Sequence, residues 1–126
     1  MIEKLALVAL GGACGASLRF LSVSAFVRLA GGTAWGTLFV NIAGSFLMGI
    51  AAVLLIERFP EATARLAPFV TVGLLGGFTT FSAFSLDAIR LIEDGKISAA
   101  TAYVLGSVIF SILALVAGLL LGRAVF

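Results

Sequence analysis

The sequence contains no histidine and only one cysteine, and these shortages exclude several kinds of chemistry. Histidine is the commonest metal ligand and proton carrier near neutral pH, so we expect neither a histidine metal centre nor a histidine proton relay. The single cysteine, Cys14, cannot form a disulfide within one chain. Because it lies in an apolar run, we interpret it as a small buried residue. No nucleophile, general base or metal-ligating cluster is present, so we expect that the protein is not an enzyme.

Charge is also scarce. Charged residues make up 11% of the 126 residues, whereas hydrophobic residues make up 62%. A soluble domain carries roughly 25% charged residues, and a domain of this length cannot bury so large an apolar share. The net charge of +2 is too small and too scattered to indicate nucleic-acid binding. The composition therefore predicts an integral membrane protein whose outer surface is in contact with the lipid bilayer.

Long uncharged runs are what the sequence has in abundance. A membrane-spanning helix needs about 20 apolar residues, whereas barrel strands are shorter and alternate in polarity. We expect an all-α, multi-pass protein of the cell (plasma or inner) membrane, with the first run acting as a span and not as a cleaved signal. Residues 1–126 form a single four-helix transmembrane domain, joined by polar loops at 57–61 and 87–96. The predicted spans are 5–27, 33–56, 66–86 and 97–122.

Small residues recur in these runs at the spacing of helix-packing faces. In lipid, a small residue at every fourth position lets two helix backbones approach closely. Glycine is also simply common in membrane helices, but we favour packing for most of these positions. Four thin helices can hardly enclose a pathway, so we also expect an oligomer. The small-residue faces are Gly11 and Gly15; Asn41, Ser45 and Gly49; Gly73 and Gly77; and Gly118 and Gly122.

The third run contains a weak point near its middle. Gly76 and Gly77 are poor helix formers, and Thr79 and Thr80 follow directly. An unwound backbone inside a membrane persists only where it lines a cavity or is buried in protein. Carbonyls freed at such a break can bind a cation, and the following half-helix can face an anion. The alternative is a merely kinked helix whose Ser and Thr hydroxyls bond to their own backbone.

Polar and aromatic side chains gather around this weak point. Phe81 and Phe84 are three residues apart and so share one helical face. Asn41, in the second span, is the only amide side chain in the sequence. Taken singly, the serines of the fourth span are interhelical bonding residues, but together with Asn41 and the break they favour a polar pathway. They belong to a stripe that repeats every four residues: Tyr103, Ser107 and Ser111.

No acidic residue lies deep in any span by position, because Asp87 falls near the end of the third run. A proton-coupled exporter normally needs a carboxylate inside the membrane to carry the proton. A pathway lined by neutral donors therefore suits a small anion that moves passively.

Three motifs resemble those of the Fluc (CrcB-type) family of fluoride channels. They are Gly-Gly-Phe-Thr-Thr-Phe-Ser at 76–82 followed by Phe84-Ser85, Trp-Gly-Thr-Leu at 35–38 followed by Asn41, and Gly-Ala-Ser-Leu-Arg at 15–19. Length, number of spans and motif order agree along the whole chain. The resemblance implies a passive, fluoride-selective channel that exports cytoplasmic fluoride and so relieves its toxicity. A small multidrug-resistance-type transporter and a non-transporting membrane subunit are the alternatives.

The resemblance also implies an assembly and a set of sites. The family forms antiparallel, dual-topology homodimers with two fluoride pores. Phe81 and Phe84 match its paired phenylalanines, and Asn41 matches its pore asparagine, which donates to fluoride. The carbonyls of Gly76 and Thr79 match those that hold a structural sodium ion at the dimer axis. The residues that match the polar track are Ser82, Tyr103, Ser107 and Ser111.

The basic residues give the chain no preferred orientation. Four spans place both termini on one side, and the Lys and Arg residues divide evenly between the two sides. Because the asymmetry of Lys and Arg in short loops normally sets orientation, an even division predicts insertion in both directions. One side carries Lys4, Arg58, Arg65 and Arg123, and the other carries Arg19, Arg28, Arg90 and Lys96.

We therefore expect dual topology in cells. With Cys14→Ala as the background and single cysteines placed in the loops, an impermeant thiol reagent should label each loop from both faces of the membrane. Several lysines added to one set of loops should fix the orientation, because the existing bias is near zero. Labelling of the terminal loops from one face only would contradict the expectation.

Overall fold

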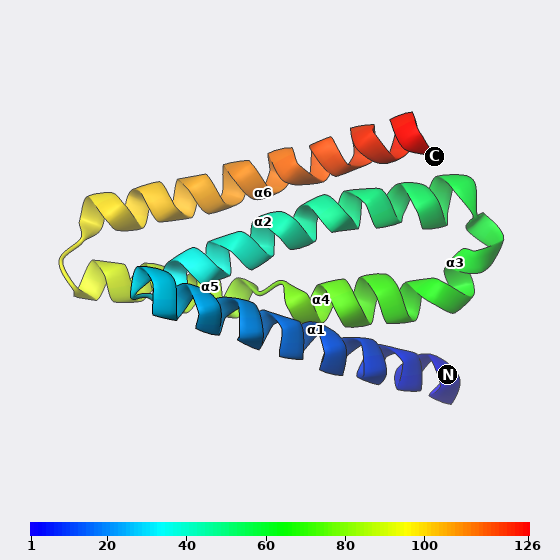
Figure 1. Ribbon diagram of the computed structural model, residues 1–126, viewed down its shortest axis with the longest axis horizontal. Coiled ribbons are helices and arrows are strands. Elements are labelled where there is room, and N and C mark those ends of the chain that lie inside the picture. The colour runs from blue at the N-terminus through cyan, green and yellow to red at the C-terminus, as the bar shows by residue number, and fades with distance from the viewer.

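The computed structural model describes all 126 residues, and the chain is helical from end to end with no strand. Figure 1 shows four rods lying side by side, with the two termini at the same end. All four are long and apolar enough to cross a membrane, which confirms the predicted four-span, all-α architecture. The elements are α1 (Ile2–Ala30), α2 (Thr33–Ala52), the π-helical η1 (Val53–Arg58), α3 (Pro60–Ala67), the π-helical η2 (Pro68–Leu75), α4 (Gly76–Phe78), α5 (Phe81–Glu93) and α6 (Ile97–Val125).

The connections between the rods are shorter than the sequence indicated. The expected loop at 57–61 is wrong, because only Phe59 lies outside a helix there and Pro60 begins α3. Proline fits the first turn of a helix, where its missing N–H would have no partner anyway. The expected loop at 87–96 is also too long, since α5 continues to Glu93. The chain then turns at Gly95, whose φ of 75° favours glycine.

Glycines bring the rods together in two pairs, which confirms the predicted packing role of the glycines, whereas Asn41 and Ser45 of the predicted α2 face line a groove. α1 packs against η2 and α4, and α2 packs against α6. A Cβ at Gly11 or Gly15 would overlap the backbone of the third rod, and a Cβ at Gly118 would overlap the Phe46 carbonyl on α2. At Gly77 a Cβ would lie 2.9 Å from the Gly12 carbonyl oxygen. Backbone contact of this kind is how membrane helices pack without a hydrophobic driving force.

The interpretation of Cys14 as a buried residue is wrong. Its side chain is exposed on the outer face of α1. In a membrane protein the outward face is as apolar as the interior because lipid is its solvent. An apolar neighbourhood in the sequence therefore does not indicate burial within the chain.

The break in the third rod lies three residues later than the glycine pair. Gly76 is helical, with φ −63° and ψ −37°. The chain leaves the helix at Thr79, with φ −85° and ψ 159°, and at Thr80, with φ −154° and ψ 122°. The third span is therefore broken near its middle, as predicted, but the extended residues are the threonines. Gly77 serves instead for close packing against α1.

The glycine contacts predict a difference between two neighbouring positions on α1. Gly15→Ala places a Cβ against the backbone of Leu74, whereas a Cβ at Gly12 meets nothing within 4 Å. Overpacking typically costs about 1–3 kcal/mol, so Gly15→Ala should lower the thermal midpoint of the detergent-solubilised protein. Gly12→Ala is the matched control and should leave the midpoint unchanged or raised, because alanine favours a helix. Equal midpoints for the two variants would show that the α1 contact is looser than described.

Candidate ion pathway beside the third-helix break

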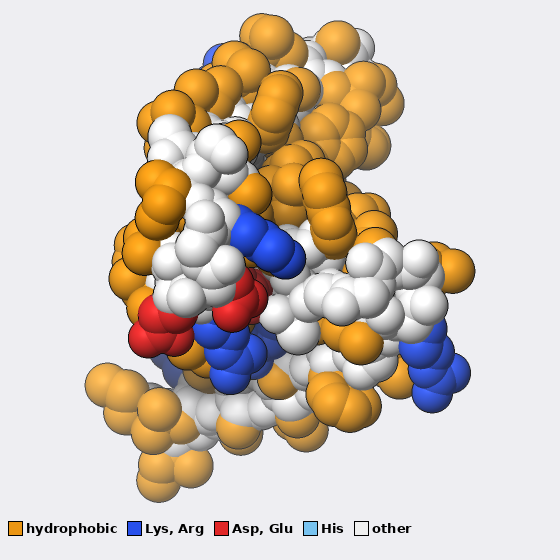
Figure 2. Space-filling model, turned by 90° about the vertical axis from the view of Figure 1, so that its left-hand side faces the viewer, with side chains coloured by type: hydrophobic (Ala, Val, Ile, Leu, Met, Phe, Trp, Pro, Cys, Tyr) orange, Lys and Arg blue, Asp and Glu red, His pale blue; other side chains and the backbone are white.

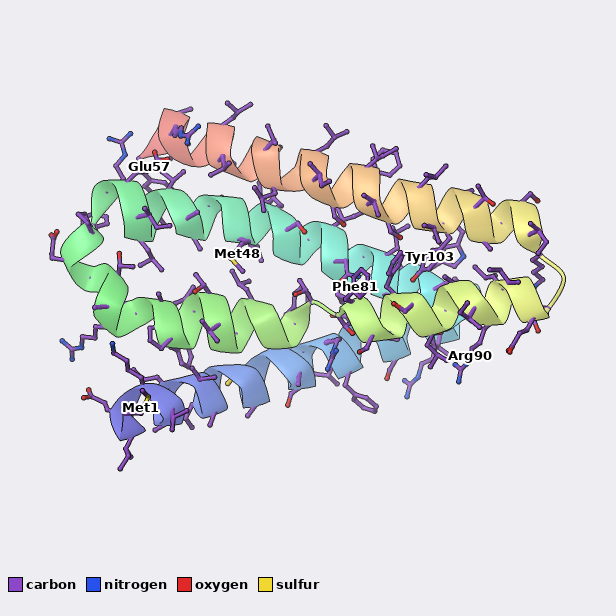
Figure 3. All side chains as sticks on the ribbon, turned by 180° about the vertical axis from the view of Figure 1, so that it is seen from behind. Met1, Met48, Glu57, Phe81, Arg90 and Tyr103 are labelled. Atoms are coloured by element: carbon purple, nitrogen blue, oxygen red, sulfur yellow. The ribbon has the colours of Figure 1, made fainter.

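The break leaves a cluster of backbone groups outside the helical hydrogen-bond pattern. The last regular bond runs from the Thr79 N–H to the Leu75 carbonyl oxygen, at 3.0 Å. No backbone amide donates to the carbonyls of residues 76–79. Figure 3 shows the interruption of the ribbon directly before Phe81. Four carbonyl oxygens are therefore free at the middle of a membrane-spanning rod.

Asn41 on α2 bonds directly to the backbone of the break. Its Oδ1 accepts from the Thr80 N–H at 2.8 Å, and its Nδ2 donates to the Thr80 carbonyl at 3.0 Å. The Thr80 hydroxyl in turn accepts from the Ala83 N–H at 3.1 Å, which caps the first turn of α5. All the polar groups of buried Thr80 thus have partners within the chain. One N–H of Asn41 is used, and one of its two donors remains.

A groove of about 320 Å³ runs beside the break, between α2 and α6. It brings together most of the predicted pathway: Asn41, Phe81, Phe84, Ser107 and Ser111 all line it, as does Thr79. Figure 3 shows Met48 projecting from α2 between that helix and the third rod. The rest of the lining is small or apolar and consists of Gly44, Ser45, Met48, Thr80, Val108, Ile112 and Leu115.

Aromatic rings form a continuous row from this groove into the protein. The centroids of Phe81 and Phe84 are 5.5 Å apart at an interplanar angle of 52°. Phe84 is buried and lies 5.5 Å from the ring of Tyr103 at 36°. Phe81 is 78% exposed, so one ring of the predicted pair faces outward. Tilted rings present electropositive edges to their surroundings, which suits a small anion.

The three residues of the fourth-span stripe do not share one environment: Ser107 and Ser111 line the groove, and Tyr103 does not. Ser107 lines the groove, is buried, and its Oγ has no hydrogen-bond partner. A buried hydroxyl without a partner is uncommon and is available to bond a polar species if neighbouring side chains move. Ser82 also lies outside the groove, with its Oγ 3.3 Å from the Thr80 hydroxyl, and Gly76 is not part of the groove lining.

Asp87 is the functional candidate that the sequence analysis missed. Its side chain is buried, and its carboxylate accepts from Thr33 at 2.5 Å, Thr37 at 2.7 Å and Tyr103 at 3.4 Å. Position along the chain placed Asp87 near the end of a span. In the structure it lies on α5, and its carboxylate contacts residues of α2 and α6. The available signal was the pair Thr33 and Thr37, which share one face of the second span.

Asp87 lines a second groove of about 290 Å³. Arg19, Arg90 and Thr37 also line this groove, and Thr80 lines both grooves. Figure 2 looks onto this end of the molecule, where Lys and Arg side chains lie beside Asp and Glu side chains. The arginine of the Gly-Ala-x-x-Arg motif is thus placed at a polar opening that reaches the break from one end.

Comparison with known proteins identifies the family of the chain. A family model described as CrcB-like protein, Camphor Resistance (CrcB), matches residues 6–119. Three relatives carry the name fluoride-specific ion channel FluC. The relative from Chelativorans sp. (strain BNC1) is 56% identical over 126 residues, covering 96% of this chain and 97% of its own. That from Paracoccus denitrificans is 51% identical over 119 residues, 94% of each chain, and that from Agrobacterium fabrum is 49% identical over 124 residues, 98% of each.

The matched residues, 6–119, reach into all four spans. The resemblance that the motifs indicated is therefore confirmed. This multi-pass membrane chain belongs to the CrcB-like family.

Proposed function

We propose that the protein is a passive, fluoride-selective channel, not an enzyme, which lets cytoplasmic fluoride leave the cell. The relatives bear the name of a fluoride-specific ion channel. The observation that carries the proposal is the groove beside the break, which is lined by the phenylalanine pair, Asn41 and two serines of the fourth span. External acid forms HF, which crosses membranes and dissociates inside, so a fluoride leak relieves the accumulation.

The groove offers what a dehydrated anion needs. A bare anion in hydrocarbon costs tens of kcal/mol by the Born estimate, so the pathway must replace much of the water shell. Phe81, Phe84 and Asn41 line the groove, and ring edges and an amide N–H are groups that can replace water around an anion. The hydroxyls of Ser107 and Ser111 line the same space. Ser82 and Tyr103 do not line this groove; they bond to Thr80 and Asp87 respectively, and we propose that they extend the polar track beyond it.

The alternative function is a small multidrug-resistance-type transporter, which would work by proton-coupled exchange. The placement of the buried acid Asp87 fits passive conduction better. Asp87 does not line the groove that holds the phenylalanine pair. Its carboxylate is bonded to three hydroxyls, those of Thr33, Thr37 and Tyr103. A coupling carboxylate has to meet both the proton and the transported species, whereas Asp87 lies outside the groove with the phenylalanine pair and accepts from three hydroxyls of the chain itself.

The partner that completes the pathway is a second copy of the chain in the opposite orientation. The groove is open along one side, and Phe81, at its edge, is 78% exposed. Four rods leave this face uncovered, while the even division of Lys and Arg permits both orientations in one membrane. An antiparallel homodimer with its two-fold axis in the membrane plane would cover both grooves and give two pores.

A structural sodium ion fits the oxygen atoms at the break. The carbonyls of Gly76 and Thr79 accept no hydrogen bond, and no group of three or more His, Cys, Asp or Glu side chains is placed to hold a metal. Unpaired carbonyls in a membrane need a partner, and hard cations are held by oxygen ligands. Gly76 and Thr79 from two copies would supply four carbonyls at the dimer axis, where the ion compensates their partial charge.

Substitution of the pathway residues should slow fluoride efflux. Phe81→Ile or Phe84→Ile keeps an apolar side chain but removes the ring edge, and Asn41→Asp replaces donors with a negative charge that repels the anion. Each should lower the rate of fluoride efflux from proteoliposomes by about tenfold or more, since ~1.4 kcal/mol of added barrier gives that factor. Gel filtration checks that the dimer remains assembled.

Phe78→Ile is the matched control. Phe78 lies beside Gly44, outside the groove lining, so its variant should conduct at nearly the parent rate. If Phe81→Ile and Asn41→Asp both conduct like the parent protein, the assigned pathway is wrong.

A further inference from the structure

We infer that Asn41 is a positioning residue that holds the third rod open, and that it keeps the Gly76 carbonyl available to a cation by taking the hydrogen bond this carbonyl would otherwise receive. The inference deepens the proposed function, because it rests on the cation site proposed there. It assigns Asn41 a role in the backbone of the break that is separate from donation to an anion.

Two acceptors compete for one backbone donor at the break, the N–H of Thr80. In a continuous α-helix the Thr80 N–H would donate to the carbonyl four residues earlier, which is that of Gly76. Thr80 donates instead to Asn41 Oδ1, at 2.8 Å. A backbone N–H has one hydrogen, so the bond to Asn41 replaces the helical bond. The Gly76 carbonyl is free because Asn41 occupies its donor.

Asn41 also bonds to the carbonyl of Thr80. Thr80 is extended, with φ −154° and ψ 122°, and its N–H and C=O meet one planar amide. The Asn41 Nδ2 donates to the Thr80 carbonyl at 3.0 Å. The two bonds reproduce the pair of bonds that one residue exchanges with its neighbour across two antiparallel strands. Asn41 thus supplies in a single side chain what a neighbouring strand would otherwise provide.

The result is an uneven distribution of satisfied groups at the break. Thr80 is fully paired, because Asn41 takes its two backbone groups and its hydroxyl accepts from Ala83. The carbonyls of Gly76 and Thr79 are unpaired. In a membrane an unpaired backbone group costs several kcal/mol, so an extended Thr80 without Asn41 would leave two more such groups. Loss of the amide should therefore return Thr79 and Thr80 to the helix.

Two substitutions separate the acceptor of Asn41 from its donor. Asn41→Leu has a similar shape and neither function, so Thr80 should bond to Gly76 again. Asn41→Asp retains an acceptor for the Thr80 N–H, so the break should stay open even though the new charge opposes fluoride. Thr101→Val is the control, because the Thr101 hydroxyl is exposed and bonds only to the Ile97 carbonyl of its own helix.

The experiment uses the full chain in lipid and two readouts other than conduction. The first is the ¹³Cα and ¹³Cβ chemical shifts of Thr79 and Thr80 by solid-state NMR, which distinguish extended from helical backbone. The second is the thermal midpoint of the dimer in sodium compared with N-methylglucamine. We expect extended shifts and a sodium-dependent midpoint in the parent, in Thr101→Val and in Asn41→Asp. We expect helical shifts and no sodium dependence in Asn41→Leu.

Extended shifts at Thr79 and Thr80 in Asn41→Leu would overturn the inference, whatever the channel conducts. The same holds if Asn41→Asp closes the break. If Asn41→Leu does not assemble, Asn41→Asp still decides, because its retained acceptor must keep the shifts extended. If the thermal midpoint of the parent protein does not depend on sodium, the cation site proposed above is wrong. The chemical shifts of Thr79 and Thr80 would still test the role of Asn41 at the break.

Discussion

The structure depends on the requirement that backbone polar groups in lipid find partners. Three of the four rods meet it by unbroken helical bonding, and the third does not. At Thr79 and Thr80 the chain extends, and Asn41 of α2 provides the partners that Thr80 loses. Two features accompany this exception: backbone carbonyls without a helical partner at residues 76–79, and a groove beside the break that is lined by phenylalanine and serine residues.

Close helix packing and the polar break are connected through the glycines. Gly11 and Gly15 bring α1 against η2, and Gly77 carries that contact up to the break. Gly49 and Gly118 join α2 to α6 in the same way. The two pairs leave room between α2, α6 and the third rod, and the groove lies there. Small residues thus determine both where the backbones touch and where they stay apart.

Composition and spacing were enough to predict four spans, their order and the packing glycines, because these depend on the chain alone. Low helix propensity predicts the break at Gly76 and Gly77, but both residues are helical, and Gly77 packs against α1. The bond from Asn41 to Thr80 and the burial of Asp87 depend on how α2, α5 and α6 are aligned in space, which residue spacing does not encode. Cys14 was misjudged because a lipid-facing surface and a protein interior have the same composition.

The most direct test of the account is the charge balance of fluoride movement. Proteoliposomes loaded with potassium fluoride should release fluoride only when a potassium ionophore lets the counter-charge leave, and collapse of the proton gradient should not change the rate. Release that needs the proton gradient and proceeds without the ionophore would contradict a passive channel built around the break.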